Sequence, residues 1–219
     1  MRPLNKIKIK WSSSFAYAIG TIATDGNLSP DGRHINITSK DKEMVKTIAV
    51  CLGAKNRIGR KSSGSSSKKK YFVLQFGDVN FYAFLMSLGI MPRKSKTIGT
   101  LKIPSRFFFD FLRGHFDGDG TFFSYWDPRW KSSFMFYTEF LSASRTHIIW
   151  LQKEIEKRLN IHGHITTNNK HQIFHLKYAK RESLILLKEM YYDSHVACLE
   201  RKRKKVKQAL KIDKNARVL

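Results

Sequence analysis

The sequence predicts an α+β protein of two pseudo-symmetric αββαββα units. Each unit is expected to hold an antiparallel four-stranded sheet with helices on one face, and two helices are expected to join the units. Helical and strand patterns recur in the same order in both halves of the 219 residues. Each half also carries a small-residue segment ending in Asp-Gly, AIGTIATDG (18–26) and LRGHFDGDG (112–120). With 42% hydrophobic and 13% aromatic residues, the composition is that of a chain with a packed core.

The first unit, residues 1–90, is predicted to begin with a helix over 15–26, capped by the serines just before it and ended by Gly26. Alternating apolar and polar residues follow at 33–40, which is typical of a half-buried strand. A helical period of apolar residues then covers 42–52. The remaining elements are a hairpin of 56–60 and 68–76, its flexible loop at 62–70, and a short helix at 80–89.

Residues 91–104 form the natural connector, and residues 105–219 repeat the pattern with a basic helix added after it. Pro104 and Ser105 mark the start of a helix over 107–120. A strong amphipathic pattern predicts a long helix over 146–159. The other predicted elements are strands at 122–126, 132–144, 164–168 and 172–178, and helices at 183–192 and 199–211.

The chain is strongly basic, with 41 Lys and Arg against 17 Asp and Glu and a formal net charge of +24. This excess indicates a polyanionic partner, and nucleic acid is favoured over an anionic membrane. The sequence has no run of about 18 apolar residues and no signal-peptide core. Cys51 and Cys198 lack metal or disulfide spacing, which favours two buried thiols. We expect no membrane association or secretion, and a cytoplasmic (nucleoid-associated) or organellar location.

Each sheet would leave one face uncovered by helices, and this face is a candidate surface for reading DNA. Polar side chains on it can pair with base edges in the major groove, which admits β-ribbons. A merely solvated surface is the alternative. Strand 132–144 is apolar on both sides, so its outward residues stay unassigned. The candidate residues are His34, Asn36, Thr38, Lys40, Tyr71 and Gln75 in the first half, and His171, His175 and Lys177 in the second.

The 56–70 hairpin is crowded with basic residues that can neutralise DNA phosphates. Such contacts position a protein on DNA without specifying sequence. They also make binding depend steeply on salt, with a log–log slope of about −0.9 for each phosphate contacted. The candidate phosphate contacts are Arg57, Arg60, Lys61, Lys68 and Lys70.

The two Asp-Gly segments are expected to pack as helices. Ala16, Gly20 and Thr24 recur four residues apart in the first, and Gly114 and Gly118 do so in the second. Glycine within a helix costs about 1 kcal/mol relative to alanine, so two on one face indicate close helix packing. Asp25 and Asp119 would then converge and repel, unless divalent cations lie between them. Mg²⁺ prefers such carboxylates together with carbonyls, waters and phosphate oxygens, which favours a metal site here. The alternative interpretation is that each Asp-Gly only forms a turn after its helix.

These residues carry a family resemblance. AIGTIATDG and LRGHFDGDG resemble the two copies of the LAGLIDADG signature, and nearly the whole chain resembles a single-chain, two-repeat LAGLIDADG homing endonuclease. The second copy matches closely. In the first copy, Ala23 replaces the first acidic residue of the motif, a position that the family does not use for metal.

The resemblance implies roles for six positions. Asp25 and Asp119 would be the metal-binding, catalytic carboxylates, with the backbone carbonyls of Thr24 and Gly118 as additional ligands. Lys94 and Lys202 would be the catalytic lysines near the scissile phosphates, where they stabilise charge or organise the nucleophilic water. For Lys202 an ordinary phosphate contact is the alternative, because it lies in the basic run LERKRKK.

The expected function is site-specific, Mg²⁺-dependent double-strand cleavage of a long, asymmetric DNA target by a monomer that needs no protein partner. Mn²⁺ is expected to substitute for Mg²⁺, and Ca²⁺ to bind without supporting cleavage. The gene would be intron-encoded or free-standing. The alternatives are an RNA-splicing maturase or a non-cleaving DNA-binding protein of the same fold, and, more remotely, a basic membrane-surface protein.

Overall fold

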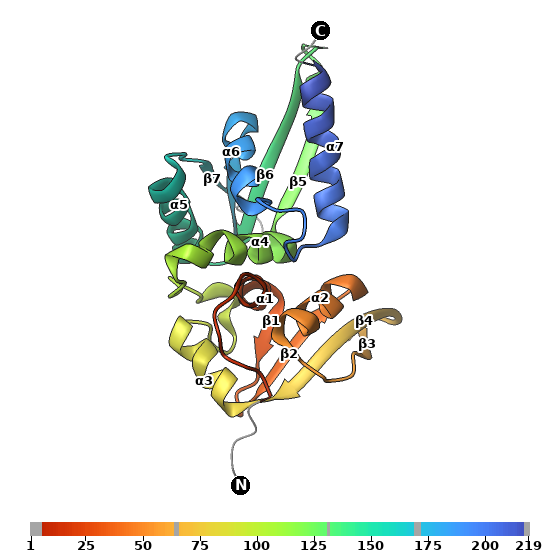
Figure 1. Ribbon diagram of the computed structural model, residues 1–219, viewed down its shortest axis with the longest axis vertical. Coiled ribbons are helices and arrows are strands. Elements are labelled where there is room, and N and C mark those ends of the chain that lie inside the picture. The colour runs from red at the N-terminus through yellow and green to blue at the C-terminus, as the bar shows by residue number, and fades with distance from the viewer. Residues whose placement is uncertain (1–5, 64–65, 131, 169–171, 217–219) are drawn as a thin grey trace.

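Two halves meet at a central pair of helices, α1 and α4, and their sheets extend from this pair in opposite directions (Figure 1). The computed structural model describes residues 6–63, 66–130, 132–168 and 172–216. None of the helices within these ranges has the length and apolar character needed to cross a membrane.

The first half follows the predicted αββαββα order, and its sheet is antiparallel with strand order β1-β2-β4-β3. Buried Ile35, Ile37, Leu74 and Phe76 line the side that faces the helices. The elements are α1 (Ser13–Asp25), β1 (Gly26–Leu28), β2 (His34–Ser39), α2 (Lys42–Leu52), β3 (Gly59–Ser63), β4 (Ser66–Gly77) and α3 (Val79–Leu88).

The second half repeats this arrangement, with the antiparallel strand order β5-β6-β8-β7. Its elements are α4 (Phe108–Asp119), β5 (Thr121–Trp126), β6 (Phe134–Ser142), α5 (Arg145–Leu159), β7 (His164–Asn168), β8 (Ile173–Tyr178) and α6 (Lys180–Met190). Two short 3₁₀ helices, η1 (Lys94–Lys96) and η2 (Ser105–Phe107), lie between the halves, and α7 (Glu200–Ala216) follows the second unit. The predicted fold class, two α+β units joined through a helix pair, is confirmed.

Local sequence signals set the helix boundaries. The Ser12 hydroxyl accepts from the Phe15 amide to begin α1, and the Asp41 carboxylate accepts from the amides of Glu43 and Met44 to begin α2. Gly53 ends α2 in the left-handed conformation, with φ of 63°. In each case a short polar side chain or a glycine satisfies backbone groups that the helix itself leaves unpaired.

Two predictions about the first unit were incomplete or wrong. Gly26 ends α1, as predicted, but its backbone is extended rather than left-handed, with φ −76° and ψ 144°, and it starts the short strand β1, which was not predicted. The segment at 62–70 is not mainly a loop, because β3 runs to Ser63 and β4 starts at Ser66. Backbone pairing across the hairpin therefore overrides the low strand propensity of its serines and lysines.

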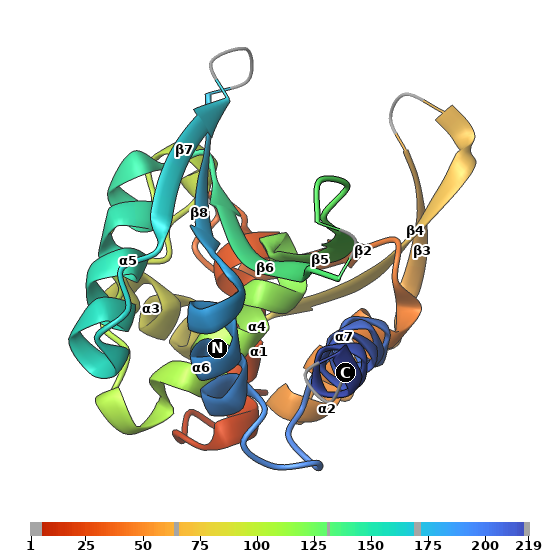
Figure 2. The same ribbon diagram turned by 90° about the horizontal axis from the view of Figure 1, so that it is seen from above.

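The two sheets leave their open faces on the same side of the molecule. Seen from above, the β3–β4 and β7–β8 hairpins rise together on this side, and the helices lie on the other (Figure 2). Helix α7 runs beside β5 and links the halves, because Arg201 Nε donates to Asp41 Oδ2 of the first half at 2.9 Å. The open faces are therefore continuous with the centre where α1 and α4 end.

Candidate active site

Helices α1 and α4 pack at backbone contact, as the small-residue pattern predicts. A Cβ atom on Gly20 would lie 2.9 Å from the Phe111 carbonyl carbon and 2.8 Å from the His115 nitrogen. One on Gly114 would lie 2.9 Å from the Tyr17 carbonyl carbon. Real Cβ atoms do not approach backbone this closely, so only glycine fits at these two positions. We call this contact the seam.

The seam brings Asp25 and Asp119 together, each as the last residue of its helix. The Asp25 carboxylate reaches across to the other helix, since a Cβ on Gly118 would lie 3.3 Å from Asp25 Oδ2. Burial and, second, the charge of Asp119 raise the pKa of Asp25 to about 6. Burial also raises the pKa of Asp119, although Lys94 and Lys202 oppose this rise. The two carboxylates therefore destabilise one another as anions.

This pair fits a divalent cation. Within the described ranges, neither carboxylate accepts a hydrogen bond or forms an ion pair, so their oxygens are available. No group of three or more His, Cys, Asp or Glu side chains in that part of the chain could hold a metal by itself. A cation at Asp25 and Asp119 would thus need further oxygens from carbonyls, waters and phosphates, which is the set that Mg²⁺ accepts.

Lys94 and Lys202 occupy corresponding places at the ends of the two seam helices. The Lys94 ammonium donates to the carbonyls of Thr24, at 3.2 Å, and Gly26. The Lys202 ammonium donates to the carbonyls of Phe116, Asp117 and Gly120 at 2.6, 2.9 and 2.6 Å. Burial lowers the pKa of each lysine to about 8. Each ammonium thus satisfies carbonyls that the helix end leaves unpaired and meets the negative end of its dipole.

Replacing Lys202 by methionine is expected to lower the free energy of unfolding by about 1–3 kcal/mol, because buried carbonyls lose their donor. Thermal or urea denaturation measures this loss. Lys204→Met, at an exposed position of the same helix, removes the same charge without this contact and is the matched control. Equal losses in the two variants would show that the ammonium does not brace the end of α4.

The motif position that Ala23 occupies in the first copy is occupied by Asp117 in the second copy, where the side chain has a structural role. Asp117 is buried, and its Oδ2 accepts from the Leu199 amide at 2.6 Å and the Tyr17 hydroxyl at 2.9 Å. It therefore ties the start of α7 to both seam helices. Ala23 is buried, and its methyl group cannot form these hydrogen bonds. The two halves therefore differ in this contact with α7, whereas each half supplies one carboxylate, Asp25 or Asp119, to the pair.

Two histidines beside the site were not found from the sequence. A pocket of about 120 Å³ is lined by Thr24, Lys94 and Asp119 together with His115 and His147. The His115 and His147 Nε2 atoms lie 3.0 Å apart, and burial lowers both pKa values, that of His147 to about 4. Their alignment with the carboxylates arises only when α5 packs against the seam, so spacing along the chain gives no signal for it.

The open face of the first sheet carries the predicted polar residues on one side. Register pairs Asn36 with both Asn27 and Gln75, and Thr38 with Val73, so these side chains share a face. Asn27 was missed because β1 was missed. Tyr71 and Lys40 also meet on this face, with the ammonium 5.7 Å from the ring centroid. His34 contacts Asp31 through Nδ1.

The second sheet shows which residues of β6 face outward. Pairing places Tyr137, Glu139 and Leu141 on the face that carries His175 and Lys177. Glu139 accepts from His175 Nδ1 at 2.8 Å and lies 3.4 Å from Lys177 Nζ. Both predicted DNA-contacting residues on β8 are thus paired with a carboxylate of their own sheet.

The basic hairpin divides between the two faces of its sheet. Lys61 pairs with Tyr71 and lies on the open face, whereas Arg60 lies over the Phe72 ring on the helix side. Arg57 is exposed just before β3. Lys68 and Lys70 belong to strand β4, and only their backbone is described. His171 lies outside the described residues. Their role in DNA binding stays a prediction.

Solved structures with this arrangement are found, although the sequence matches no protein-family model and no curated protein. The chain is similar to the homing endonuclease I-WcaI bound to its DNA recognition sequence, with 12% identity, a TM-score of 0.62, and 90% of this chain and 88% of that one covered. It is similar to I-DmoI in complex with DNA and Mn, with 14% identity, a TM-score of 0.51, and 84% and 98% covered.

The fold also matches full-length DUF199/WhiA from Thermatoga maritima, with 15% identity and a TM-score of 0.56. This match covers 92% of the chain, which spans only 63% of that protein's length. At these identities the likeness shows the fold alone. The chain has the LAGLIDADG fold, as its two motifs predict, with one Asp-Gly at the end of each seam helix.

Proposed function

We propose that the protein is a divalent-metal-dependent endonuclease that makes a double-strand break in a long, asymmetric DNA target. The observation that carries this proposal is the meeting of Asp25 and Asp119, two carboxylates without protein partners in the described part of the chain. The similar structures of I-WcaI and I-DmoI, which were solved with DNA, support the choice of partner. Because the halves differ in sequence, one chain suffices and the two half-sites differ.

The carboxylates, the lysines and the sheet faces have different roles in the proposed reaction. Asp25 and Asp119 hold the cation, each from its own half, with the Gly118 carbonyl as a further ligand. A bound divalent cation supplies Lewis-acid stabilisation of the phosphate and a nucleophilic water at neutral pH. Lys94 and Lys202 donate to the carbonyls at the helix ends, and their positive charge would stabilise negative charge that develops on a phosphate bound at the carboxylate pair. The open sheet faces bind the duplex on either side.

Cleavage of a randomised duplex library tests this function. The purified protein is expected to cut a small set of sequences in Mg²⁺ or Mn²⁺ and to bind the same sequences uncut in Ca²⁺. Mg²⁺, Mn²⁺ and Ca²⁺ are suitable probes because structures of I-DmoI were solved with each of them. Sequence-selective binding without any cutting in Mg²⁺ or Mn²⁺ would show that the fold serves binding alone in this protein.

A non-cleaving nucleic-acid-binding protein, or a maturase that promotes splicing of an intron, is the second candidate. One observation favours it: the Thr24 carbonyl, expected as a metal ligand, already accepts from Lys94 at 3.2 Å. A carbonyl oxygen has two lone pairs, so this hydrogen bond competes with a metal without excluding one. Acceleration of intron splicing by a protein that leaves the duplex library uncut would establish this alternative.

Metal binding is expected to weaken as the pH falls through about 6, because protonation of Asp25 removes one charged ligand. Titration with Mn²⁺ between about pH 5 and pH 8 measures this dependence. The folded-state pKa is raised from 3.8, so the metal-free protein gains stability as the pH falls from about 6 toward that value. Metal affinity that does not change over this range would place the cation away from Asp25.

A further inference from the structure

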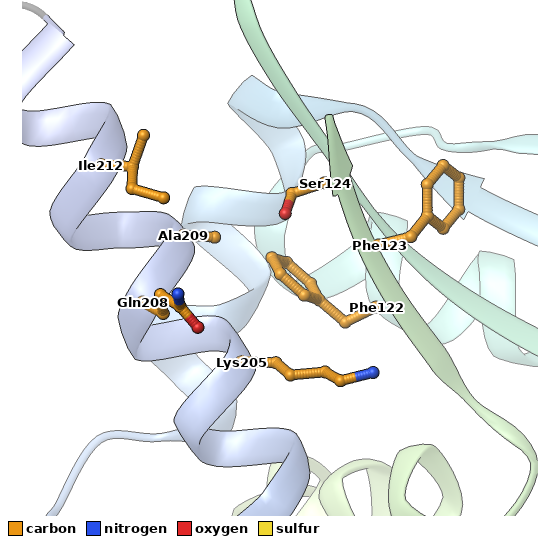
Figure 3. Close-up of a pocket in the computed structure, with 7 residues that line it drawn as sticks. All are labelled: Phe122, Phe123, Ser124, Lys205, Gln208, Ala209 and Ile212. Carbon is orange, nitrogen blue, oxygen red and sulfur yellow. The ribbon is translucent and has the colours of Figure 1, made fainter. Parts of the chain in front are cut away.

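Three aromatic side chains form a ridge on the open face of the second sheet. Phe123 and Tyr125 of β5 and Tyr137 of β6 share this face, and their exposed fractions include 38% for Phe123 and 41% for Tyr125. Phe122, the neighbour of Phe123, points to the other side of the strand, toward a pocket of about 330 Å³ beside α7 (Figure 3). The ridge is therefore set by strand alternation and contributes little to the core.

The rings of the ridge stand in a row with nearly parallel planes. The Tyr137 centroid lies 5.2 Å from that of Phe123, with 14° between the planes, and 6.3 Å from that of Tyr125, with 6° between them. Tyr137 thus has one aromatic neighbour directly opposite and one diagonally across the strand pair, and the three rings form a continuous aromatic surface on the open face.

This geometry separates two ways of contacting nucleic acid. Proteins that stack unpaired bases offer an open aromatic face to each base. In the ridge each ring packs against another ring of the same face, with planes within 14° of parallel, so no ring stands alone as a stacking platform. Such a continuous aromatic surface instead matches the thymine C5-methyl group, the apolar feature that a base pair shows in the major groove.

The position of the ridge selects the part of the duplex it would meet. Strand β5 begins two residues after Asp119, so Phe123 and Tyr125 follow that carboxylate by four and six residues. At about 3.4 Å per residue, these rings lie about 13–20 Å along the strand from the carboxylate pair, or about four to six base pairs. The same face continues through His175 and Lys177, and the chain carries a net charge of +24, which favours a polyanion over an apolar protein surface.

We propose that Phe123, Tyr125 and Tyr137 read thymine methyl groups in the major groove of the second half-site, about four to six base pairs from the centre of the target. This inference rests on the proposed binding of duplex DNA and goes beyond it by naming the readout. The first sheet has Asn36 and Gln75 side by side on its face and reads its half-site by hydrogen bonds. The two half-sites are thus recognised by different chemistry.

Deoxyuridine, which lacks only the methyl group, provides the test. Targets are first selected from a duplex library by binding in Ca²⁺, without any need for cleavage. Deoxyuridine then replaces thymidine in one half-site at a time, and the affinity of the wild-type protein is measured at fixed salt. In the second half-site each lost methyl contact is expected to weaken binding about fourfold. The first half-site is expected to tolerate the replacement.

Variants connect this effect to the ridge. Phe123→Ser combined with Tyr137→Ser is expected to bring the thymidine-to-deoxyuridine affinity ratio close to one. Trp130→Ser, at a 69% exposed aromatic in the turn after β5, is the matched control and is expected to keep the wild-type ratio. Because the deoxyuridine comparison uses the wild-type protein, its result does not depend on how the variants fold.

The possible failures are distinguishable. If no duplex is enriched, the proposed function is wrong and the readout is overturned with it. If a duplex is enriched but deoxyuridine leaves its affinity unchanged in the second half-site, only the readout is overturned. Loss of polythymidine single-strand binding in the double variant, with duplex affinity unchanged, would assign the ridge to unpaired bases and also overturn it.

Discussion

Asp119→Asn and Asp25→Asn are each expected to abolish double-strand cleavage while the protein still binds its selected duplex. Each substitution keeps the shape of the side chain but removes one of the two charged ligands. The loss of one electrostatic group lowers the catalytic rate by about a hundredfold to a thousandfold, which leaves no cleavage visible in an ordinary assay. Cleavage in Mg²⁺ and gel-shift binding in Ca²⁺ measure the two properties separately. Asp193→Asn, at an exposed carboxylate in the loop before α7, is the matched control.

The same change is expected to stabilise the metal-free fold. Burial and Asp119 raise the pKa of Asp25, so its anion costs folding free energy above about pH 6. Asp25→Asn should therefore raise the free energy of unfolding by about 1–2 kcal/mol at neutral pH without metal. Undiminished cutting by both single variants would contradict the site, and lost cutting with lost stability would indicate damage to the fold.

Gly114→Ala and Gly20→Ala are expected to destabilise the protein by about 3 kcal/mol or more, since each new methyl group would enter the backbone of the facing helix. The helices can accept it only by moving apart, which also separates the two carboxylates. Urea denaturation measures the first effect, and cleavage of the selected target measures the second. The higher helix propensity of alanine offsets only about 1 kcal/mol.

Gly99→Ala provides the matched control for the seam. A Cβ at Gly99 would have its nearest neighbour at 3.9 Å, an ordinary contact, so the substitution is expected to be nearly neutral. Similar denaturation midpoints for Gly99→Ala and Gly114→Ala would show that α1 and α4 do not pack at backbone contact in solution.

The sequence predicted the fold because helix and strand periods repeat in the two halves. It failed where pairing outweighs local pattern. Strand β1 has only three residues, Gly26–Leu28, too few to show a period, and it forms because β2 pairs with it. The stretch from Ser66 becomes strand through its partner β3 rather than through propensity. Strand β6 is apolar on both sides because its outward face carries Tyr137 and Leu141.

The candidate site was predicted in part, for a physical reason. The small residues of the seam recur four apart on their own helices, and each carboxylate directly follows the last of them, so a pattern within each helix places the carboxylates together. Lys94 and Lys202 were found only through resemblance, since they reach the site from segments remote in sequence. His115 and His147 carried no signal, because their contact is made by tertiary packing of α5 on α4.

The bracing of α4 by Lys202 also has a consequence for biosynthesis. The ribosome makes Asp25, Asp119 and both sheets before it reaches α7, so the growing chain holds both carboxylates while the end of α4 still lacks its ammonium. Until Lys202 emerges, the carbonyls of Phe116, Asp117 and Gly120 have no lysine donor. A nascent or prematurely terminated chain would therefore carry the acidic pair in an unbraced centre, and the competent form would arise late in translation.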